Sequence, residues 1–256
     1  MELHQRLIEH FAEKAEREII EIVSIGVGYT AVQLTSGGMG LSYTYFESKQ
    51  SCSLIKNYVD YEGQPANRLL PMLLSENRLE RSMALALVNA LNYQSALQLP
   101  VNRKNEELFD KLGIRKGSQV AMVGFFGPLL EIIKQREASL EVIDTFRGLG
   151  NKQTFRRKLN EWADVLILTS TSILNDTTED VLEACGSRVR TIMLGPSTPL
   201  VKAAFMHLPV HILGGTVPVG HENVLKAIRH GTGTPVIQKF SRKSYLEMES
   251  SGRQSE

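Results

Sequence analysis

The chain has 256 residues, of which 42% are hydrophobic, and a formal net charge of +1 at pH 7. This length fits one large domain or two small ones, and the near-zero charge excludes a general attraction to nucleic acid or to an anionic membrane. No apolar stretch reaches the roughly 18 to 20 residues that span a bilayer, and the N-terminus lacks the apolar core of a signal peptide. Because Cys52 and Cys185 lie far apart, we expect a reduced, cytoplasmic protein.

The first hundred residues combine helix patterns with a predicted hairpin. Apolar residues from Leu3 to Phe11 recur at helical spacing, which indicates an amphipathic N-terminal helix. The turn signal Thr35–Gly38 separates two strand-like runs and favours a hairpin. The predicted elements after the first helix are a long strand over 21–34, a strand over 41–46, a short helix over 66–74 and a helix over 81–97. Residues 1–100 are therefore expected to form a smaller α+β domain.

The second half repeats one pattern, in which a short apolar run ends at Gly, Ser or Thr residues and a helix signal follows. Such runs indicate parallel strands buried on both faces. The predicted strands are 119–123, 140–143, 164–168, 189–194 and 210–213, with a last helix over 222–229 and a loose polar tail over 238–256. We therefore predict an α/β protein in which residues 101–256 form a Rossmann-like domain with a parallel sheet. Ligands of such sheets bind outside the carboxyl ends of the strands.

Gly124, Phe125 and Gly127 follow the first of these strands. Their spacing is not the GxGxxG fingerprint of a dinucleotide site, although backbone N–H groups at the start of a helix can hold an anion. A ligand-binding turn and a plain connection are both open. Asp144 follows the next strand, where Rossmann folds place the carboxylate that binds ribose hydroxyls; the alternative is a solvated turn residue.

The densest polar cluster is Thr169-Ser170-Thr171-Ser172, with Asn175 and Thr177 just beyond. Thr177 and the acid three residues later fit a capping box, which would explain Thr177 structurally. The hydroxyls directly after a buried strand are suited to bind carboxylates or phosphates, and we interpret them as part of a ligand site.

Gly195-Pro196-Ser197-Thr198-Pro199 follows the next predicted strand. A helix cap at Ser197 and Thr198 with proline in the first turn would account for these residues. A site shared with the preceding cluster is the other interpretation, because neighbouring strands end at the same edge of a sheet.

The sequence predicts no metal ligands and leaves any catalytic residues unknown. His207 and His211 are four residues apart, but Pro209 breaks the helix that such a metal-binding pair needs. No GxSxG elbow or Ser-His-Asp order is present.

At these motifs the C-terminal half resembles domain-of-unknown-function family 364, the "putative heavy-metal chelation" domain, and the N-terminal half resembles domain-of-unknown-function family 4213. The C-terminal matches are the stretches 123–128, 163–171, 175–177, 194–200 and 214–216; the N-terminal matches are 28–31, 38–41, 80–82 and 86–91. The resemblance runs from about Glu9 to Gly233. Two positions depart from the family pattern, since Asp144 stands where a Glu is expected and Ser170 where a Gly is common.

The resemblance implies an enolase N-terminal-like domain packed on a Rossmann-like domain, with a cleft between them and a role in heavy-metal chelation or cobalamin-type cofactor metabolism. Tyr29, Arg81 and Asn89 are the candidates to close the site from the N-terminal half. Arg81 is equally suited to bind a ligand carboxylate or to form a structural salt bridge.

We expect a small anionic ligand or metal chelate, such as a tetrapyrrole or metallophore, with any metal carried by the ligand itself. The alternatives are a nucleotide- or S-adenosylmethionine-using enzyme, with Asp144 on the ribose, and a non-enzymatic ligand sensor or carrier. Whether the protein is an enzyme, and whether it forms a homo-oligomer, are left open. Neither nucleic acid nor membrane is expected as a partner.

Overall fold

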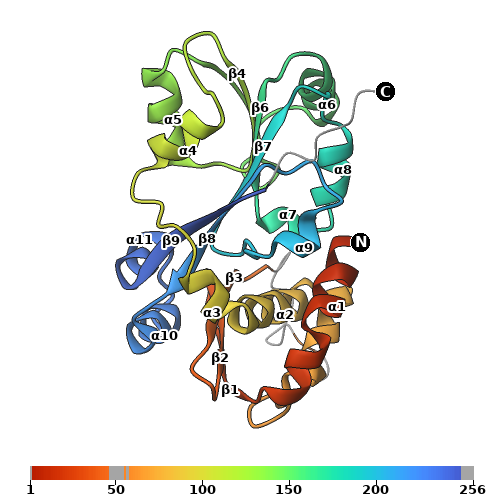
Figure 1. Cartoon of the computed structure of the whole chain (residues 1–256), viewed down its shortest axis with the longest axis vertical. Helices are drawn as coiled ribbons and strands as arrows, with labels where there is room; N and C mark the ends of the chain where they lie inside the picture. Colours follow the sequence, from red (N-terminus) through yellow and green to blue (C-terminus); the bar gives the residue numbers. More distant parts are fainter. Residues whose placement is uncertain (1, 46–54, 56–57, 249–256) are drawn as a thin grey trace.

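The computed structural model describes residues 2–45, 55 and 58–248, and it contains two sheets (Figure 1). A three-stranded antiparallel sheet has the order β1-β2-β3, and a six-stranded sheet has the order β5-β4-β6-β7-β8-β9. The first five strands of the larger sheet pair in parallel, and only β9 is antiparallel. The predicted α/β fold class, with a smaller α+β part, is therefore confirmed. None of the helices in the described residues combines the length and the hydropathy of a membrane span.

The N-terminal half begins with α1 (Glu2–Arg17), whose apolar face is buried as the helical spacing predicts. The expected long strand over 21–34 is wrong. The chain instead forms β1 (Ile20–Ile25), turns at Gly26, and returns as β2 (Tyr29–Leu34). A Cβ on Gly26 would lie 2.5 Å from the Ile228 carbonyl oxygen, so the turn depends on glycine. The apolar residues on both sides of this turn concealed it in the sequence.

The predicted hairpin is confirmed, because β2 pairs in antiparallel register with β3 (Met39–Tyr43) across the turn at residues 35–38. Gly37 has a φ of 85°, which favours glycine at this point. The predicted strand extended to Phe46, which lies outside the described residues.

The helices between the two sheets differ from the prediction in their ends. The expected helix over 66–74 is two 3₁₀ helices, η1 (Ala66–Arg68) and η2 (Leu70–Leu74). The expected helix over 81–97 is α2 (Arg78–Leu91), which Asn77 caps through the Leu79 N–H group, followed by α3 (Tyr93–Leu97).

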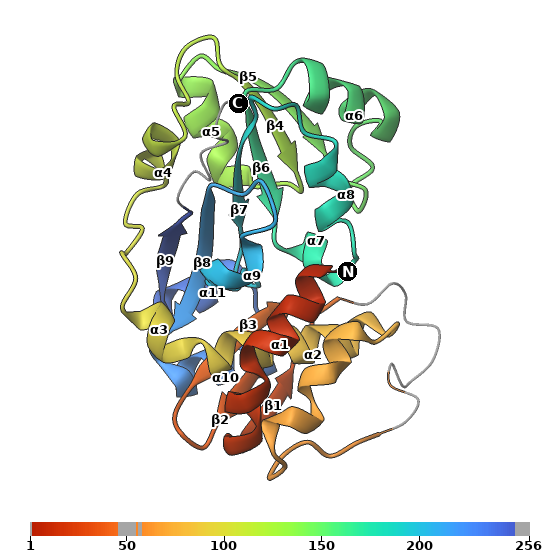
Figure 2. The ribbon, with the colours of Figure 1, turned by 45° about the vertical axis from the view of Figure 1, so that its right-hand side comes forward.

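Helices cover both faces of the six-stranded sheet, as the views in Figures 1 and 2 show. The apolar side chains of α4 and α5 pack on one face, and those of α6, α8 and α9 pack on the other. The parallel strands are β4 (Gln119–Val123), β5 (Ser139–Ile143), β6 (Val165–Thr169), β7 (Arg190–Leu194) and β8 (Ile212–Pro218). The helices among them are α4 (Asn105–Lys111), α5 (Gly127–Gln135), α6 (Lys152–Glu161), α7 (Thr171–Leu174), α8 (Thr178–Glu183) and α9 (Lys202–Phe205).

The predicted loose tail is wrong over most of its described part. After α11 (Thr234–Ile237) and η3 (Gln238–Phe240), the strand β9 (Ser241–Glu247) pairs along the whole of β8. Its polar composition suits an antiparallel edge strand with one exposed face, and this composition led to the incorrect prediction. Residues 249–256 lie outside the described part.

The C-terminal segment also returns to the small sheet. Val224, Leu225 and Ile228 of α10 (His221–Arg229) form one apolar cluster with Ala31 and Leu41. The opposite face of the small sheet packs on α2. The predicted domain boundary between residues 100 and 101 stays a prediction.

Candidate functional site

The candidate site lies at the carboxyl edge of the parallel strands, which faces the N-terminal half. The chain places β5 on one side of β4 and β6 on the other, so the order of the strands reverses between β4 and β6. In open α/β sheets, ligands bind in the crevice at such a reversal. Gly124 follows β4 and Thr169 ends β6. We call Gly124, Thr169 and Thr171 the switch-point edge.

Gly124 allows β4 and β6 to end close together. It has a φ of 87°, and a Cβ at this position would lie 2.9 Å from the Thr169 Cβ. The close approach of these two residues therefore requires glycine, whether or not a ligand is bound.

The start of α5 offers few donors for an anion. Phe126 at the cap makes no side-chain hydrogen bond, Pro128 has no N–H group, and the Leu129 N–H group donates to the Phe126 carbonyl oxygen at 2.9 Å. Among the first three residues of this helix, Gly127 alone retains a backbone donor for a ligand. This geometry is less favourable for a phosphate than a complete turn of free N–H groups.

The Asp144 carboxylate stabilises its own loop. Its Oδ1 accepts a hydrogen bond from the Arg147 N–H group at 3.0 Å, and its Oδ2 lies 3.9 Å from Arg147 Nε. The backbone groups of Asp144 and Leu149 exchange two further hydrogen bonds. Arg147 then lies over the Phe125 ring, 4.5 Å from its centroid. Asp144 is thus held at the rim of the edge with one oxygen already in use.

Thr169 and Thr171 are half-buried, and their hydroxyl oxygens lie 3.0 Å apart. Ser170 between them is fully buried and packs against Gly195, where a Cβ would come within 2.3 Å of the Ser170 Oγ. Of these three residues, the two threonines are therefore partly accessible, while Ser170 is buried in the contact with the residue that follows β7.

Asn175 and Thr177 bond to each other, since the Thr177 hydroxyl donates to Asn175 Oδ1 at 2.7 Å. The predicted capping box is wrong, because Thr177 makes no side-chain hydrogen bond to α8. The hydroxyl is turned back toward the preceding loop, and the amide oxygen of Asn175 is partly satisfied by it.

Ser197 and Asn89 join the two halves of the molecule. Ser197 Oγ accepts a hydrogen bond of 2.7 Å from the Tyr43 N–H group on the outer edge of β3. Asn89 Nδ2 donates to the Leu41 carbonyl at 2.8 Å and to the Ser197 carbonyl at 3.3 Å. Beside them, Gly40 lies directly on α2. We call Gly40, Tyr43, Asn89 and Ser197 the β3 seam.

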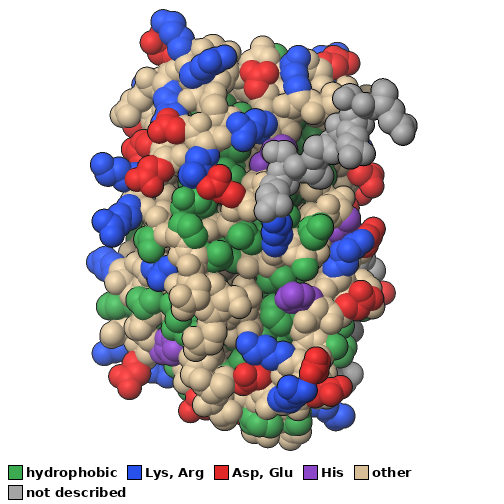
Figure 3. Space-filling view, viewed as in Figure 1, with side chains coloured by type: hydrophobic (Ala, Val, Ile, Leu, Met, Phe, Trp, Pro, Cys, Tyr) green, Lys and Arg blue, Asp and Glu red, His purple; other side chains and the backbone are tan. Residues whose placement is uncertain are grey.

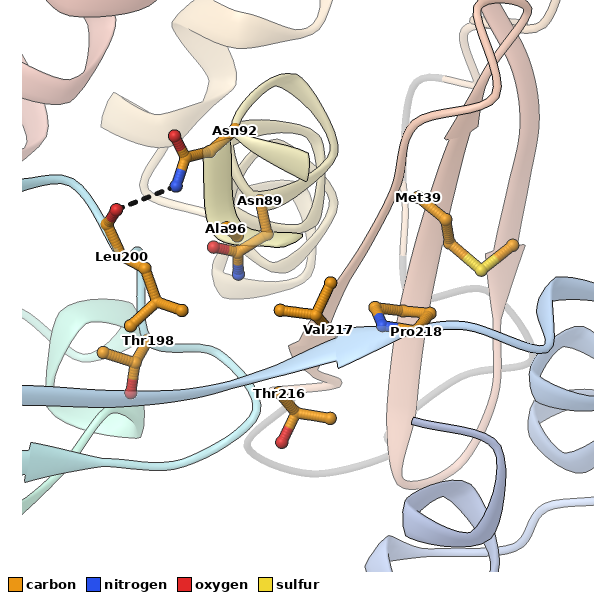
Figure 4. A pocket seen from close by; sticks show the side chains of 9 residues that line it. All are labelled: Met39, Asn89, Asn92, Ala96, Thr198, Leu200, Thr216, Val217 and Pro218. Carbon is orange, nitrogen blue, oxygen red and sulfur yellow. Dashed lines mark hydrogen bonds between the residues drawn. The ribbon is translucent and has the colours of Figure 1, made fainter. Parts of the chain in front are cut away.

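The predicted helix cap at Ser197 and Thr198 is wrong, since α9 begins only at Lys202. Thr198 is 2% exposed, and its Oγ1 has no hydrogen-bond partner among the described residues. It lines a small pocket between α2, α3, β3 and β8 (Figure 4). The centre of a water molecule can occupy about 10 Å³ of this pocket. The pocket therefore suits a single ordered water and excludes a larger ligand.

Arg81 forms an ion pair with Asp176, so the structure shows the salt bridge that the sequence offered as one alternative. Asp176 also lies 3.6 Å from His4 Nδ1, while His4 Nε2 lies 2.8 Å from the Ile173 carbonyl oxygen. Burial is the main cause that lowers the pKa of His4, against the attraction of Asp176. The buried His4 and Arg81 thus connect α1 and α2 to the partly exposed Asp176 in the loop after α7.

Comparison with known families places these features in context. Residues 107–247, more than half of the chain, match the family model DUF364, described as "Putative heavy-metal chelation". Residues 8–92 match DUF4213, which carries the same description.

The chain belongs to the DUF364 family.

DUF364 proteins of known structure share this fold. A family member of unknown function from Pyrococcus horikoshii is 19% identical, with a TM-score of 0.76 over 96% of this chain and 100% of the other. Another from Desulfitobacterium hafniense is 20% identical, with a TM-score of 0.73 over 95% and 98% of the two chains. An uncharacterized protein of Methanocaldococcus jannaschii is 21% identical over 97% of both chains. The resemblance seen in the sequence is confirmed.

Tyr29, predicted to close the site, is buried, and its hydroxyl lies 2.6 Å from Thr234 Oγ1 beside α10. Sequence reasoning missed Tyr43 and Tyr45, which are half-buried with rings 6.1 Å apart. Burial raises the pKa of Tyr43, and Tyr45 and Asp144 raise it further. Two tyrosines alternating at the end of a predicted strand were the signal that could have identified them.

The described residues do not fit a resident heavy metal in this DUF364 protein. Within them, no group of three or more His, Cys, Asp or Glu side chains could hold an ion. Burial raises the pKa of the Cys185 thiol to about 11, so this sulfur stays protonated near neutral pH. Cys52 lies outside the described residues. Positive and negative side chains are interspersed over the face shown in Figure 3.

Proposed function

We propose that the protein binds a small anionic ligand at the switch-point edge, and that this ligand carries or receives a heavy metal. Tetrapyrroles and metallophores are ligands of this kind. The observation that carries the proposal is the position of Thr169 and Thr171, whose hydroxyl groups are half-buried at the reversal of strand order. One of these hydroxyls donates to the other, and the remaining hydroxyl hydrogen can be donated to a carboxylate.

The family description supports the involvement of a heavy metal. The side chains of the described residues support the view that the ligand, and not the protein, holds this metal. Heavy metals prefer thiolate and imidazole ligands, and the described residues do not gather such groups. The ligand's own donors would therefore hold the metal, while the protein would bind the ligand's periphery. Arg147 at the rim of the edge supplies a positive charge for this task.

A nucleotide- or S-adenosylmethionine-using enzyme is less well supported. The Asp144 carboxylate already accepts the Arg147 N–H group, and α5 begins with few free donors. A non-enzymatic carrier would bind the same ligand at the same edge, but it would release the ligand chemically unaltered. We also propose that the protein forms a homo-oligomer, and the experiment below tests this as well.

Native mass spectrometry tests this function on protein purified anaerobically without chelators or a His tag. We expect a bound organic mass that carries metal, and the same spectrum reports the oligomeric state. An adduct that contains adenosine without metal would favour the nucleotide alternative. Incubation of an adduct-bearing sample, followed by a second spectrum, separates an enzyme from a carrier because only an enzyme changes the mass.

A further inference from the structure

The turn that follows α7 has a backbone conformation that usually belongs to glycine. Asp176 has a φ of 58°, and the Thr177 N–H group closes the helix by donating to the Ser172 carbonyl oxygen at 3.0 Å. Glycine is the usual residue at this point of such a closure, because a Cβ makes a positive φ unfavourable. The Asp176 side chain is held by its ion pair with Arg81 of the N-terminal half. Both halves of the molecule therefore fix this turn.

Asn175, which comes directly before this turn, lies one helical turn from the switch-point edge. It caps the C-terminal end of α7, and Thr171 is the first residue of the same single-turn helix. Residues four apart on a helix share one face, with their Cβ atoms roughly 5–6 Å apart. Both side chains are half-buried. The Asn175 side chain therefore lies on the same face of α7 as the Thr171 hydroxyl.

The hydroxyl of Thr177 fixes the orientation of the Asn175 amide. It donates to Asn175 Oδ1 at 2.7 Å, so the amide oxygen is turned toward Thr177. The Nδ2 atom at the other end of the amide carries two N–H donors. Within the part of the chain that the structure describes, no acceptor bonds to this Nδ2 atom. The half-buried amide thus has its acceptor in use and both of its donors available.

We infer that Thr177 orients the Asn175 amide so that its N–H groups bind the anionic oxygens of the ligand. An amide in the opposite orientation would present its oxygen, which cannot bond to a carboxylate. Asn175 is then the residue that selects a deprotonated oxyanion, and Thr177 is a positioning residue that does not touch the ligand. The inference rests on the proposed function and assigns its specificity for an anion to one side chain.

The test uses zinc uroporphyrin, a tetrapyrrole with peripheral carboxylates, whose binding to the full-length protein is measured by its fluorescence. Thr177→Val removes the hydroxyl at nearly constant shape, so the amide can rotate and affinity should fall about three- to tenfold. Thr177→Ser keeps a hydroxyl and should recover most of the affinity. Asn175→Asp keeps an acceptor for the Thr177 hydroxyl but replaces both donors, so it should weaken binding at least about tenfold.

Asn223→Asp controls for the added charge, because it makes the same change at an exposed position in the first turn of α10 and should leave the affinity unchanged. In ¹⁵N-labelled wild type, the side-chain amide signals of Asn175, assigned by their loss in Asn175→Asp, should shift when the porphyrin is added.

Two results would overturn the inference while leaving the proposed function standing. One is wild-type affinity of Thr177→Val, or an equal loss in Thr177→Val and Thr177→Ser, since the hydroxyl would then not set the affinity. The other is porphyrin binding that leaves the Asn175 amide signals unchanged. If wild type does not bind the porphyrin, the result would count against both the inference and the proposed function.

Discussion

The β3 seam and the switch-point edge are built from the same kinds of residue but differ in what their polar groups contact. At the seam, Ser197 is fully buried. Its hydroxyl accepts the Tyr43 N–H group of the other half, and the Asn89 amide donates to the Ser197 carbonyl. At the edge, Thr169 and Thr171 are half-exposed and bond to each other. A hydroxyl residue after a buried strand therefore has a structural role where a second element covers it. It remains suited to binding where none does.

The largest effect is expected from Gly40→Ala at the seam. A Cβ there would lie 2.2 Å from the backbone oxygen of Ala86 and from the backbone nitrogen of Ala90 in α2. Separating β3 from α2 should cost about 3 kcal/mol or more of the free energy of unfolding, measured by urea denaturation. Gly233→Ala is the control, because its Cβ would meet nothing within 4 Å. Wild-type stability of Gly40→Ala would show that the seam is not tightly packed.

Ser197→Ala should have the next largest effect. It leaves the partly buried Tyr43 N–H group without its acceptor, which costs about 1–2 kcal/mol. Denaturant unfolding measures this loss, and Ser95→Ala on the exposed side of α3 serves as the control. If Ser197→Ala loses ligand binding at unchanged stability, Ser197 belongs to the site and the contrast between the two regions fails.

The buried His4 makes the contact between the halves sensitive to acid. Burial lowers the pKa of His4 from its ordinary value of 6.5. The unfolded chain therefore binds a proton more readily than the folded protein, and stability is complete above pH 6.5 and is lost as the pH falls below it. Burial also lowers the pKa of His207, His211 and His221, which adds to the same trend.

His4→Gln should make the free energy of unfolding less dependent on pH between about 7.5 and 5.5. The glutamine amide can still donate to the Ile173 carbonyl, so folding should survive the change. Urea denaturation at several pH values measures the slope. An identical slope in wild type and variant would assign the acid sensitivity to the other histidines.

The smallest effect on stability is expected from Thr171→Ala at the switch-point edge. It removes one half-buried hydroxyl bonded to Thr169, which is worth about 0.5–1 kcal/mol. The same variant should lose the organic mass that wild type retains in native mass spectrometry. Thr154→Ala, at an exposed position in the first turn of α6, is the matched control. A large fall in melting temperature with the bound mass retained would show that the Thr171 hydroxyl stabilises the fold and does not bind the ligand.

The parallel sheet could be predicted from the sequence because its strands are continuous apolar runs. The prediction for β4 is confirmed at both ends, and β5, β6 and β7 are displaced by one residue at one or both ends. The strand β9 could not be found in this way, since an edge strand with one exposed face has no such run. The turn at Gly26 was concealed by apolar residues on both sides.

The sheet edge that carries the candidate residues could be predicted from the sequence, but the contacts that each of these residues makes could not. Ser197 and Tyr43 are 154 positions apart, and Arg81 and Asp176 are 95 positions apart. No local pattern reports such contacts, because they depend on how the two halves pack. Tyr43 and Tyr45 alternate at the end of a predicted strand, but the position of that strand beside Ser197 depends on how the two halves pack.

The return of α10 to the small sheet has a consequence for any attempt to study the halves separately. A fragment that ends near residue 100 would lack Val224, Leu225 and Ile228, and it would expose the apolar surface around Ala31 and Leu41 to water. Such a fragment is expected to aggregate, because uncovered apolar sheet surface favours self-association. Expression trials should therefore use the full-length chain. If one half is to be isotope-labelled, the two halves should be joined by protein splicing only after they have folded together.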